Sequence, residues 1–135
     1  MAAVTTNTIQ RNTRQRAAIR NVFLQHDHPL SAQEVLDLAQ KEVRGMGLAT
    51  VYRNLKALVE ERWISTVEMP GEAPRDEISG KGHHHHFLCE GCGQLFEIKT
   101  CLHDFAHLTP HGFELRSHEI FLYGVCATCR AKHGG

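Results

Sequence analysis

Metal-binding residue types are concentrated in the second half of this chain. Two Cys-x-x-Cys pairs, Cys89 with Cys92 and Cys126 with Cys129, are separated by 33 residues. Each pair can occupy a tight turn with both sulfurs facing one ion, so four thiolates can surround zinc as a tetrahedron. Iron–sulfur proteins usually group three of their cysteines more closely. The pattern therefore predicts a structural zinc site that links the beginning of this half to its end.

Four consecutive histidines, His83 to His86, precede the first cysteine pair. In an extended segment His83 and His85 point to one face, and His84 and His86 point to the other. A solvated polar run or the remnant of an expression tag is the alternative, but the run is internal and strand-forming residues follow it at once. We therefore expect one strand to serve two metal sites.

Each of these sites needs further ligands from neighbouring elements. Cys101 and His118 are candidates for one face, with Cys101 on the apolar side of a short helix. Glu77 and Glu97 are candidates for the other face, and His28 could add a ligand from the N-terminal half. For Cys101 the role of a small buried hydrophobic residue stays open as an alternative.

The N-terminal half has the composition of a domain that meets a polyanion. Residues 1–62 hold nine Lys and Arg against six Asp and Glu, a net charge of +3, whereas the whole chain balances at zero. Apolar periodicity predicts helices over residues 13–25, 32–41 and 49–62, and Ser31 with Glu34 forms a capping box before the second. Residues 63–79 alternate as a hairpin. Three helices and a hairpin make a winged helix-turn-helix.

The third predicted helix should bury Val51, Leu55, Leu58 and Val59, which leaves polar side chains on its outer face. A small helical domain without a nucleic-acid role is the alternative, but this outer face and the arginines of the first helix favour DNA. The predicted DNA contacts are Arg14, Arg16, Thr50, Tyr52, Arg53 and Lys56.

The glycine-containing segment 79–82 is a predicted hinge, so the expected domains are residues 1–80 and 81–135. In the second domain we expect strands over 87–98 and 112–125, with a short helix between Thr100 and Pro110. The expected class is therefore α+β. No segment approaches the roughly 20 apolar residues of a membrane span, and no signal peptide is visible. These features predict a cytoplasmic protein whose paired cysteines bind metal.

Two other classes of function fit the sequence less well. The segment from His103 to His107 is close to the H-E-x-x-H pattern of zinc hydrolases, but it has Asp104 where that pattern needs glutamate. Its histidines should lie opposite Leu102 and Phe105, exposed to solvent, so catalysis is not expected. A zinc store would bind metal without preferring DNA, which the outer face of the third helix contradicts.

Several blocks, in order, resemble the ferric uptake regulator superfamily. They are Gly47 to Leu55, the histidine run leading into Cys89 to Gly93, His111 to Phe113, and Leu122 to Cys129. The resemblance implies an N-terminal winged helix, a small C-terminal α/β dimerisation domain and a structural zinc held by four cysteines. It also implies metal-dependent binding of a homodimer to AT-rich palindromic operators in double-stranded DNA.

The resemblance also assigns roles to individual residues. The positions from which the family's recognition helix contacts DNA fall on Tyr52 and Arg53. One regulatory site falls on His83, His85 and His118, and the second on Glu77, His84, His86 and Glu97. The usual glutamate of the first site falls on Cys101 when counted back from His118, or on Asp104 when counted forward from Cys92. The family usually has a histidine beside the second helix. That position is occupied here by Pro29, and His28 lies one residue before it.

The ligand types bear on which metal is sensed. Three imidazoles with a thiolate suit zinc better than ferrous iron, and the unbroken histidine run resembles the zinc-sensing branch. We therefore predict a zinc-responsive repressor of metal-uptake genes, with no membrane partner and no small-molecule substrate. An iron-responsive regulator stays open through Glu77 and Glu97, with ferrous iron in place of regulatory zinc. A peroxide-sensing regulator is a third alternative, less favoured because that branch usually carries aspartates at those two positions.

Overall fold

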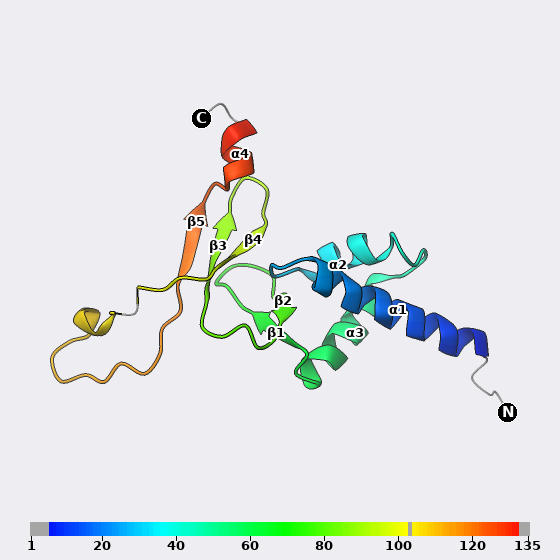
Figure 1. Ribbon diagram of the computed structural model, residues 1–135, viewed down its shortest axis with the longest axis horizontal. Helices are drawn as coiled ribbons and strands as arrows, with labels where there is room; N and C mark the ends of the chain where they lie inside the picture. The colour runs from blue at the N-terminus through cyan, green and yellow to red at the C-terminus, as the bar shows by residue number, and fades with distance from the viewer. Residues whose placement is uncertain (1–5, 103, 133–135) are drawn as a thin grey trace. The chain divides into compact units, whose positions relative to one another are not determined.

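The computed structural model describes residues 6–102 and 104–132, so His103 of the predicted hydrolase-like motif lies outside the described residues. The chain divides into two compact units, Met1–Gly80 and Lys81–Gly135 (Figure 1). Each unit has its own elements and is described by itself. Among the described residues, none of the helices combines the length and apolar character that a bilayer crossing requires.

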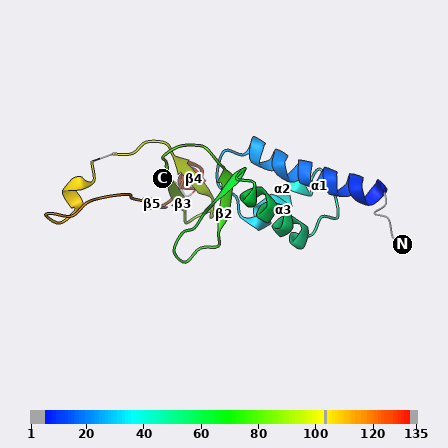
Figure 2. The same cartoon turned by 90° about the horizontal axis from the view of Figure 1, so that it is seen from below.

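The N-terminal unit contains three helices followed by a two-stranded sheet. The helices are α1 (Thr6–Gln25), α2 (Ala32–Ala39) and α3 (Leu48–Glu60). The strands β1 (Ile64–Val67) and β2 (Arg75–Ile78) are antiparallel, with Ile64 opposite Ile78. The three helices pack against one another, and Figure 2 shows them grouped from a second direction. This is the predicted winged helix arrangement.

The core of this unit follows the apolar stripes of the helices. Ile19 and Phe23 of α1 pack with Val35 of α2 and with Val51 and Leu58 of α3, all nearly inaccessible to solvent. Burial of such side chains contributes about 1.5–3 kcal/mol each before the cost of ordering the chain, so this cluster is a main source of stabilisation in the unit. The same packing fixes which face of α3 is left for a partner.

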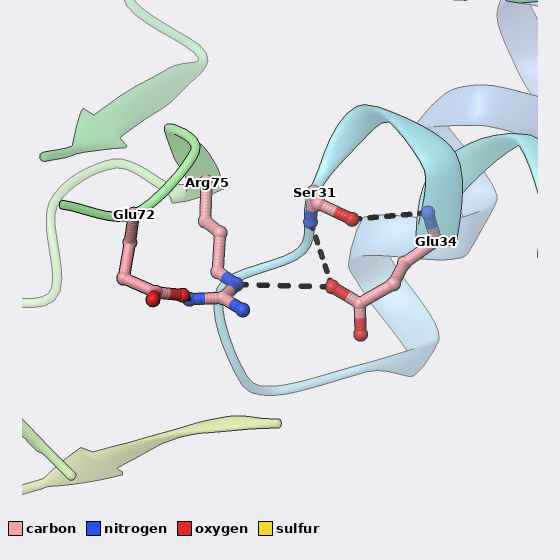
Figure 3. Close-up of polar contacts among 4 residues, drawn as sticks. All are labelled: Ser31, Glu34, Glu72 and Arg75. Atoms are coloured by element: carbon pink, nitrogen blue, oxygen red, sulfur yellow. Dashed lines mark hydrogen bonds and ion pairs between the residues drawn. The ribbon is translucent and has the colours of Figure 1, made fainter. Parts of the chain in front are cut away.

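The predicted capping box at the start of α2 is confirmed. The Glu34 N–H donates to Ser31 Oγ at 3.2 Å, and the Ser31 N–H donates to Glu34 Oε1 at 2.9 Å. Figure 3 shows that the Arg75 guanidinium at the start of β2 lies between two carboxylates, 3.9 Å from Glu34 and 3.6 Å from Glu72. The beginning of α2 is thereby tied to the hairpin.

The predicted bounds of all three helices need correction. The first helix begins at Thr6 rather than at residue 13, α2 ends at Ala39 rather than at residue 41, and α3 spans Leu48–Glu60 rather than 49–62. The apolar pattern predicts a buried Val59, but 38% of its surface is exposed. It lies about 80° around the helix from Val51, at the edge of the apolar stripe. Arg62 adopts a left-handed φ of 62°, which stops the helix.

The C-terminal unit is built on a three-stranded sheet with the order β4-β3-β5. Strands β3 (His85–Cys89) and β4 (Leu95–Ile98) are antiparallel, whereas β3 and β5 (Phe121–Gly124) are parallel. A parallel pair needs a long crossover, which the segment between β4 and β5 supplies. It contains the 3-10 turn η1 (Ala106–Leu108), and helix α4 (Ala127–Lys132) follows β5.

Two predictions for this crossover are wrong. The strand expected over 112–125 forms only at 121–124, because only that part pairs with β3. The short helix reduces to η1 and does not include Cys101. Its supposed inward face is open, since Leu102 and Leu108 are 86% and 78% exposed. Apolar spacing alone could not reveal that no described element of this unit covers that face.

Candidate metal centres and nucleic-acid interface

Four potential ligands meet at one end of the C-terminal sheet. His83 lies just before β3 and His85 begins it, Cys101 follows β4, and His118 precedes β5. The Nε2 atoms of His83 and His118 are 3.1 Å apart, and Cys101 Sγ lies 3.1 Å from His85 Nε2 and 3.2 Å from His118 Nε2. All four ligand atoms lie within 4.8 Å of one another. Three imidazoles and one thiol thus form a single donor set.

His85 is the most constrained member of this set. It is only 3% exposed, and the Ile120 N–H donates to its Nδ1 at 3.2 Å, which turns Nε2 toward Cys101. Burial lowers the pKa of His85, and repulsion from the neighbouring histidines, His83 and His118 first, lowers the pKa further. The ring is therefore neutral at neutral pH, which is the form that binds metal.

The structure brings Cys101, and not Asp104, to these histidines. The Asp104 side chain is 68% exposed and lies 3.1 Å from His107 Nε2 instead. His107 is itself 84% exposed, as predicted. The hydrolase-like motif therefore has no enclosed site around these two residues.

The predicted alternation of the histidine run is confirmed. The rings of His83 and His85 are 4.5 Å apart, and those of His84 and His86 are 4.8 Å apart. On the second face His86 is the register partner of Glu97, whose carboxylate lies 3.3 Å from Lys81 Nζ.

Two of the predicted ligands belong to the other unit. Glu77 lies in β2, and His28 lies between α1 and α2. A second regulatory site made of Glu77, His84, His86 and Glu97 would take ligands from both units, and it stays a prediction.

The four paired cysteines meet at the opposite end of the same sheet. Cys89 ends β3 and Cys92 lies in the turn after it, while Cys126 and Cys129 lie at the start of α4. The N–H groups of Cys92 and Cys126 donate to Cys89 Sγ at 3.4 and 3.3 Å, and the Cys129 N–H donates to Cys126 Sγ at 3.4 Å. Backbone donors aimed at sulfur stabilise thiolates, so the turns are built to hold negative sulfur.

The two buried thiols of this cluster differ in acidity. Hydrogen bonds from the backbone of Cys126 and Cys92 lower the pKa of Cys89 to about 6. The hydrogen bond with the Cys126 side chain and burial raise the pKa of Cys129 to about 12. At neutral pH one sulfur is therefore ionised while another keeps its proton. A divalent cation could replace that proton, which fits a closed tetrahedral zinc site.

Gly91 shapes the first cysteine turn. A Cβ at this position would lie 3.1 Å from Cys129 Sγ and 3.5 Å from Cys89 Sγ. Side chains other than hydrogen would therefore push the sulfurs apart. The glycine lets the turn close over the cluster.

The predicted DNA contacts lie on two helices of the N-terminal unit. Arg14 and Arg16 are exposed on α1, while Tyr52, Arg53 and Lys56 are exposed on α3. Thr50 is half-buried and its Oγ1 accepts a hydrogen bond from Arg53 Nη2 at 3.1 Å, which orients the guanidinium. The first turn of α3 has no acidic residue, so its positive end is not neutralised locally.

Sequence reasoning missed one polar residue of this region. Gln15 is only 5% exposed and lines a cavity between α1 and α3. Glutamine is mostly found at the surface, so its residue type gives no warning of burial. The available signal was its position, since Gln15 lies three and four residues before the buried Ala18 and Ile19.

Comparison with known proteins agrees with this arrangement. The sequence pattern of the Ferric uptake regulator family matches residues 7–123. The chain belongs to this family. The Zinc uptake regulation protein of Mycobacterium tuberculosis is 35% identical to this chain over 127 residues, and the match covers 90% of this chain and 95% of that protein. The Ferric uptake regulation protein of Campylobacter jejuni is 29% identical over 122 residues, covering 87% and 78%.

A solved structure supports the same assignment. The Helicobacter pylori ferric uptake regulator, described as having three functional metal binding sites, shares 26% identity with a TM-score of 0.63. The match covers 88% of this chain and 84% of that one. The predicted fold class, α+β with an N-terminal winged helix, is therefore confirmed, and the chain is a metal-responsive transcriptional regulator, not an enzyme. The relatives are named for both iron and zinc.

Proposed function

We propose that this ferric uptake regulator family member is a homodimeric, zinc-responsive repressor of metal-uptake genes that acts in the cytoplasm. The observation that carries the proposal is the contact of Cys101 with two histidines at 3.1 and 3.2 Å. A thiolate with three imidazoles is a donor set that prefers zinc over ferrous iron or manganese, which favour more oxygen ligands. His83, His85, Cys101 and His118 would hold this regulatory zinc.

A second zinc would have a structural role. Its four ligands come from two segments that are far apart in sequence, the end of β3 with the turn after it and the start of α4; they are Cys89, Cys92, Cys126 and Cys129. A metal ion here would link the two ends of a small unit that has few buried apolar side chains. In such units the free energy of metal binding contributes to folding.

Regulation would follow from a shift between populations. Metal at the regulatory sites would favour arrangements in which the two winged-helix units of the dimer fit successive major grooves. The metal-free protein would sample other arrangements. The second site, with Glu77 from one unit and His84, His86 and Glu97 from the other, would couple metal binding to that choice. Because this site contains carboxylates, ferrous iron is the alternative regulatory metal.

A homodimer is supported by apolar side chains that the C-terminal unit does not cover. Exposed hydrophobic residues gathered in one unit mark an interaction surface, and a second copy is the simplest partner. Each of the following is at least 48% exposed: Leu102, Leu108, Phe113, Leu122, Tyr123 and Val125.

The experiment compares metals at the regulatory site alone. Mild chelation should remove the regulatory metal, with one structural zinc per protomer verified by metal analysis. Zinc, ferrous iron or manganese is then titrated against a fluorescent duplex that the zinc-loaded protein has selected from a random pool. We expect zinc to restore binding at the lowest free concentration. Undiminished binding before metal is added refutes metal control, and activation by iron at lower free concentrations supports the iron alternative.

A further inference from the structure

A buried lysine–carboxylate pair lies on the second face of the histidine run. Lys81 Nζ is 3.3 Å from Glu97 Oε2, and the two side chains are only 15% and 7% exposed. Glu97 lies opposite His86, which is itself buried. Lysine and glutamate are almost never buried unless they are paired. An ammonium group therefore neutralises a carboxylate that the family resemblance assigns to the second regulatory site.

The backbone around Lys81 is bent by two glycines. Gly80 and Gly82 have φ values of 84° and 77°, a left-handed conformation that other residues rarely adopt. Between these bends Lys81 is the first residue of the C-terminal unit, and it contacts Glu97 in β4 of the same unit. Because Lys81 belongs to the predicted hinge segment 79–82, the contact links the conformation of that segment to the sheet.

The histidines on this face are arranged for a metal ion. His84 Nδ1 lies 2.8 Å from the carbonyl oxygen of Gly82, and a carbonyl can only accept, so Nδ1 carries the proton. In a neutral ring Nε2 then keeps its lone pair, which is the usual arrangement in metal-binding histidines. The rings of His84 and His86 are 4.8 Å apart. The imidazoles can therefore bind a metal ion, whereas the nearby carboxylate of Glu97 is held by an ammonium group.

A metal ion and the ammonium group would compete for Glu97. Zinc binds a carboxylate oxygen at about 2.0–2.2 Å, and a divalent cation at that distance would repel the nearby ammonium. The contact between Lys81 and Glu97 is 3.3 Å long, whereas strong charge-assisted hydrogen bonds measure about 2.7–2.9 Å. The ammonium is thus held loosely enough for a metal ion to replace it.

We propose that Lys81 is an internal competitor for the second regulatory site. Its ammonium group holds Glu97 until a metal ion binds there and displaces it. The inference rests on the proposed function in that this site must bind metal. Lys81 would raise the metal concentration at which the site fills. Its release from Glu97 would also make the conformation of segment 79–82 depend on metal occupancy.

The first test measures metal affinity in the full-length protein, with the structural zinc in place. Cobalt is titrated after mild chelation. The thiolate charge-transfer band follows the site that contains Cys101, and d–d absorption that grows without this band follows the second site. Lys81→Met removes the ammonium but keeps an unbranched side chain. Lys132→Met is the control, because Lys132 is an exposed lysine of the same unit and the change of charge is the same.

We expect Lys81→Met to fill the second site at about tenfold lower cobalt concentration than wild type, because hydrogen bonds to charged groups contribute more than neutral ones. Lys132→Met should fill it at the wild-type concentration. The charge-transfer band of the first site should be the same in all three proteins. Equal filling of the second site by wild type and Lys81→Met overturns the inference.

The second test follows Lys81 in the wild-type protein and needs no substitution. A short pulse of acetic anhydride modifies accessible lysines, and mass spectrometry measures the rate at each one. Lys81 should react slowly without regulatory metal and severalfold faster at saturating zinc, relative to the exposed Lys132. In Glu97→Gln it should react quickly even without added metal. A Lys81 rate that does not rise when the site fills overturns the inference.

Failure of the proposed function gives a different result. If neither wild type nor Lys81→Met binds metal beyond the structural zinc and the site that contains Cys101, the second regulatory site fails and the inference fails with it. If the inference alone is wrong, the second site fills with equal affinity in both proteins and Lys81 stays protected from acetylation.

Discussion

Replacing Glu34 separates two contributions to the stability of the N-terminal unit. Its carboxylate accepts the Ser31 N–H at 2.9 Å and also lies 3.9 Å from Arg75 Nε. In a Glu34→Gln variant the amide oxygen can still accept the hydrogen bond but the charge is gone, whereas Glu34→Ala removes both interactions. The Glu34 side chain is 36% exposed, so the long ion pair should contribute only about 0.5 kcal/mol.

The capping interaction should contribute more than the ion pair. Loss of a helix cap costs about 1 kcal/mol, and loss of a negative charge in the first turn costs about 0.3–0.5 kcal/mol. We therefore expect Glu34→Gln to lower the free energy of unfolding by about 0.5–1 kcal/mol and Glu34→Ala by about 1.5–2 kcal/mol. For a unit of this size the alanine variant should lower the melting temperature by about 6–15 °C.

Trp63 provides the assay, because it is the single tryptophan of the chain and packs edge-on against Phe23 at 6.2 Å. Urea unfolding followed by its fluorescence reports on the N-terminal unit. High salt should reduce the effect of Glu34→Gln and leave most of the effect of Glu34→Ala. Equal losses in the two variants would mean that the charge, and not the cap, stabilises the start of α2.

Three further outcomes are expected. Cys101→Ser should abolish the cobalt–thiolate charge-transfer band of protein loaded with cobalt at the regulatory site, while the structural zinc content stays unchanged; a retained band would place the thiolate elsewhere. Gly91→Ala should weaken zinc retention by the four-cysteine cluster in a chelator competition, because its Cβ would lie 3.1 Å from Cys129 Sγ. Burial raises the pKa of Asp76, and the hydrogen bond from Thr66 lowers it by a smaller amount. The ionised Asp76 side chain therefore lowers the stability of the unit at pH values above its folded pKa. This loss of stability disappears as the pH falls through the folded pKa. Asp76→Asn should therefore stabilise the unit more at pH 7 than at pH 4 in urea unfolding, and an equal gain at both pH values would contradict the shift.

Local patterns were sufficient for the parts of the molecule whose chemistry is local. The capping box of Ser31 and Glu34 depends on a spacing of three residues, and the two faces of the histidine run depend on strand alternation. The two cysteine pairs are tight turns whose sulfurs converge by their own geometry. These features could be predicted because few residues and short distances along the chain determine them.

Tertiary packing decided the rest. Cys101, rather than Asp104, reaches His85 because the crossover leaves β4 beside the start of β3 and returns through His118, and no periodicity encodes that path. Gln15 is buried because α3 covers the face of α1 that carries it, although glutamine by itself favours water. A residue's own chemistry determines what it can bind, whereas the elements packed around it determine whether it is presented to a ligand, a partner or solvent.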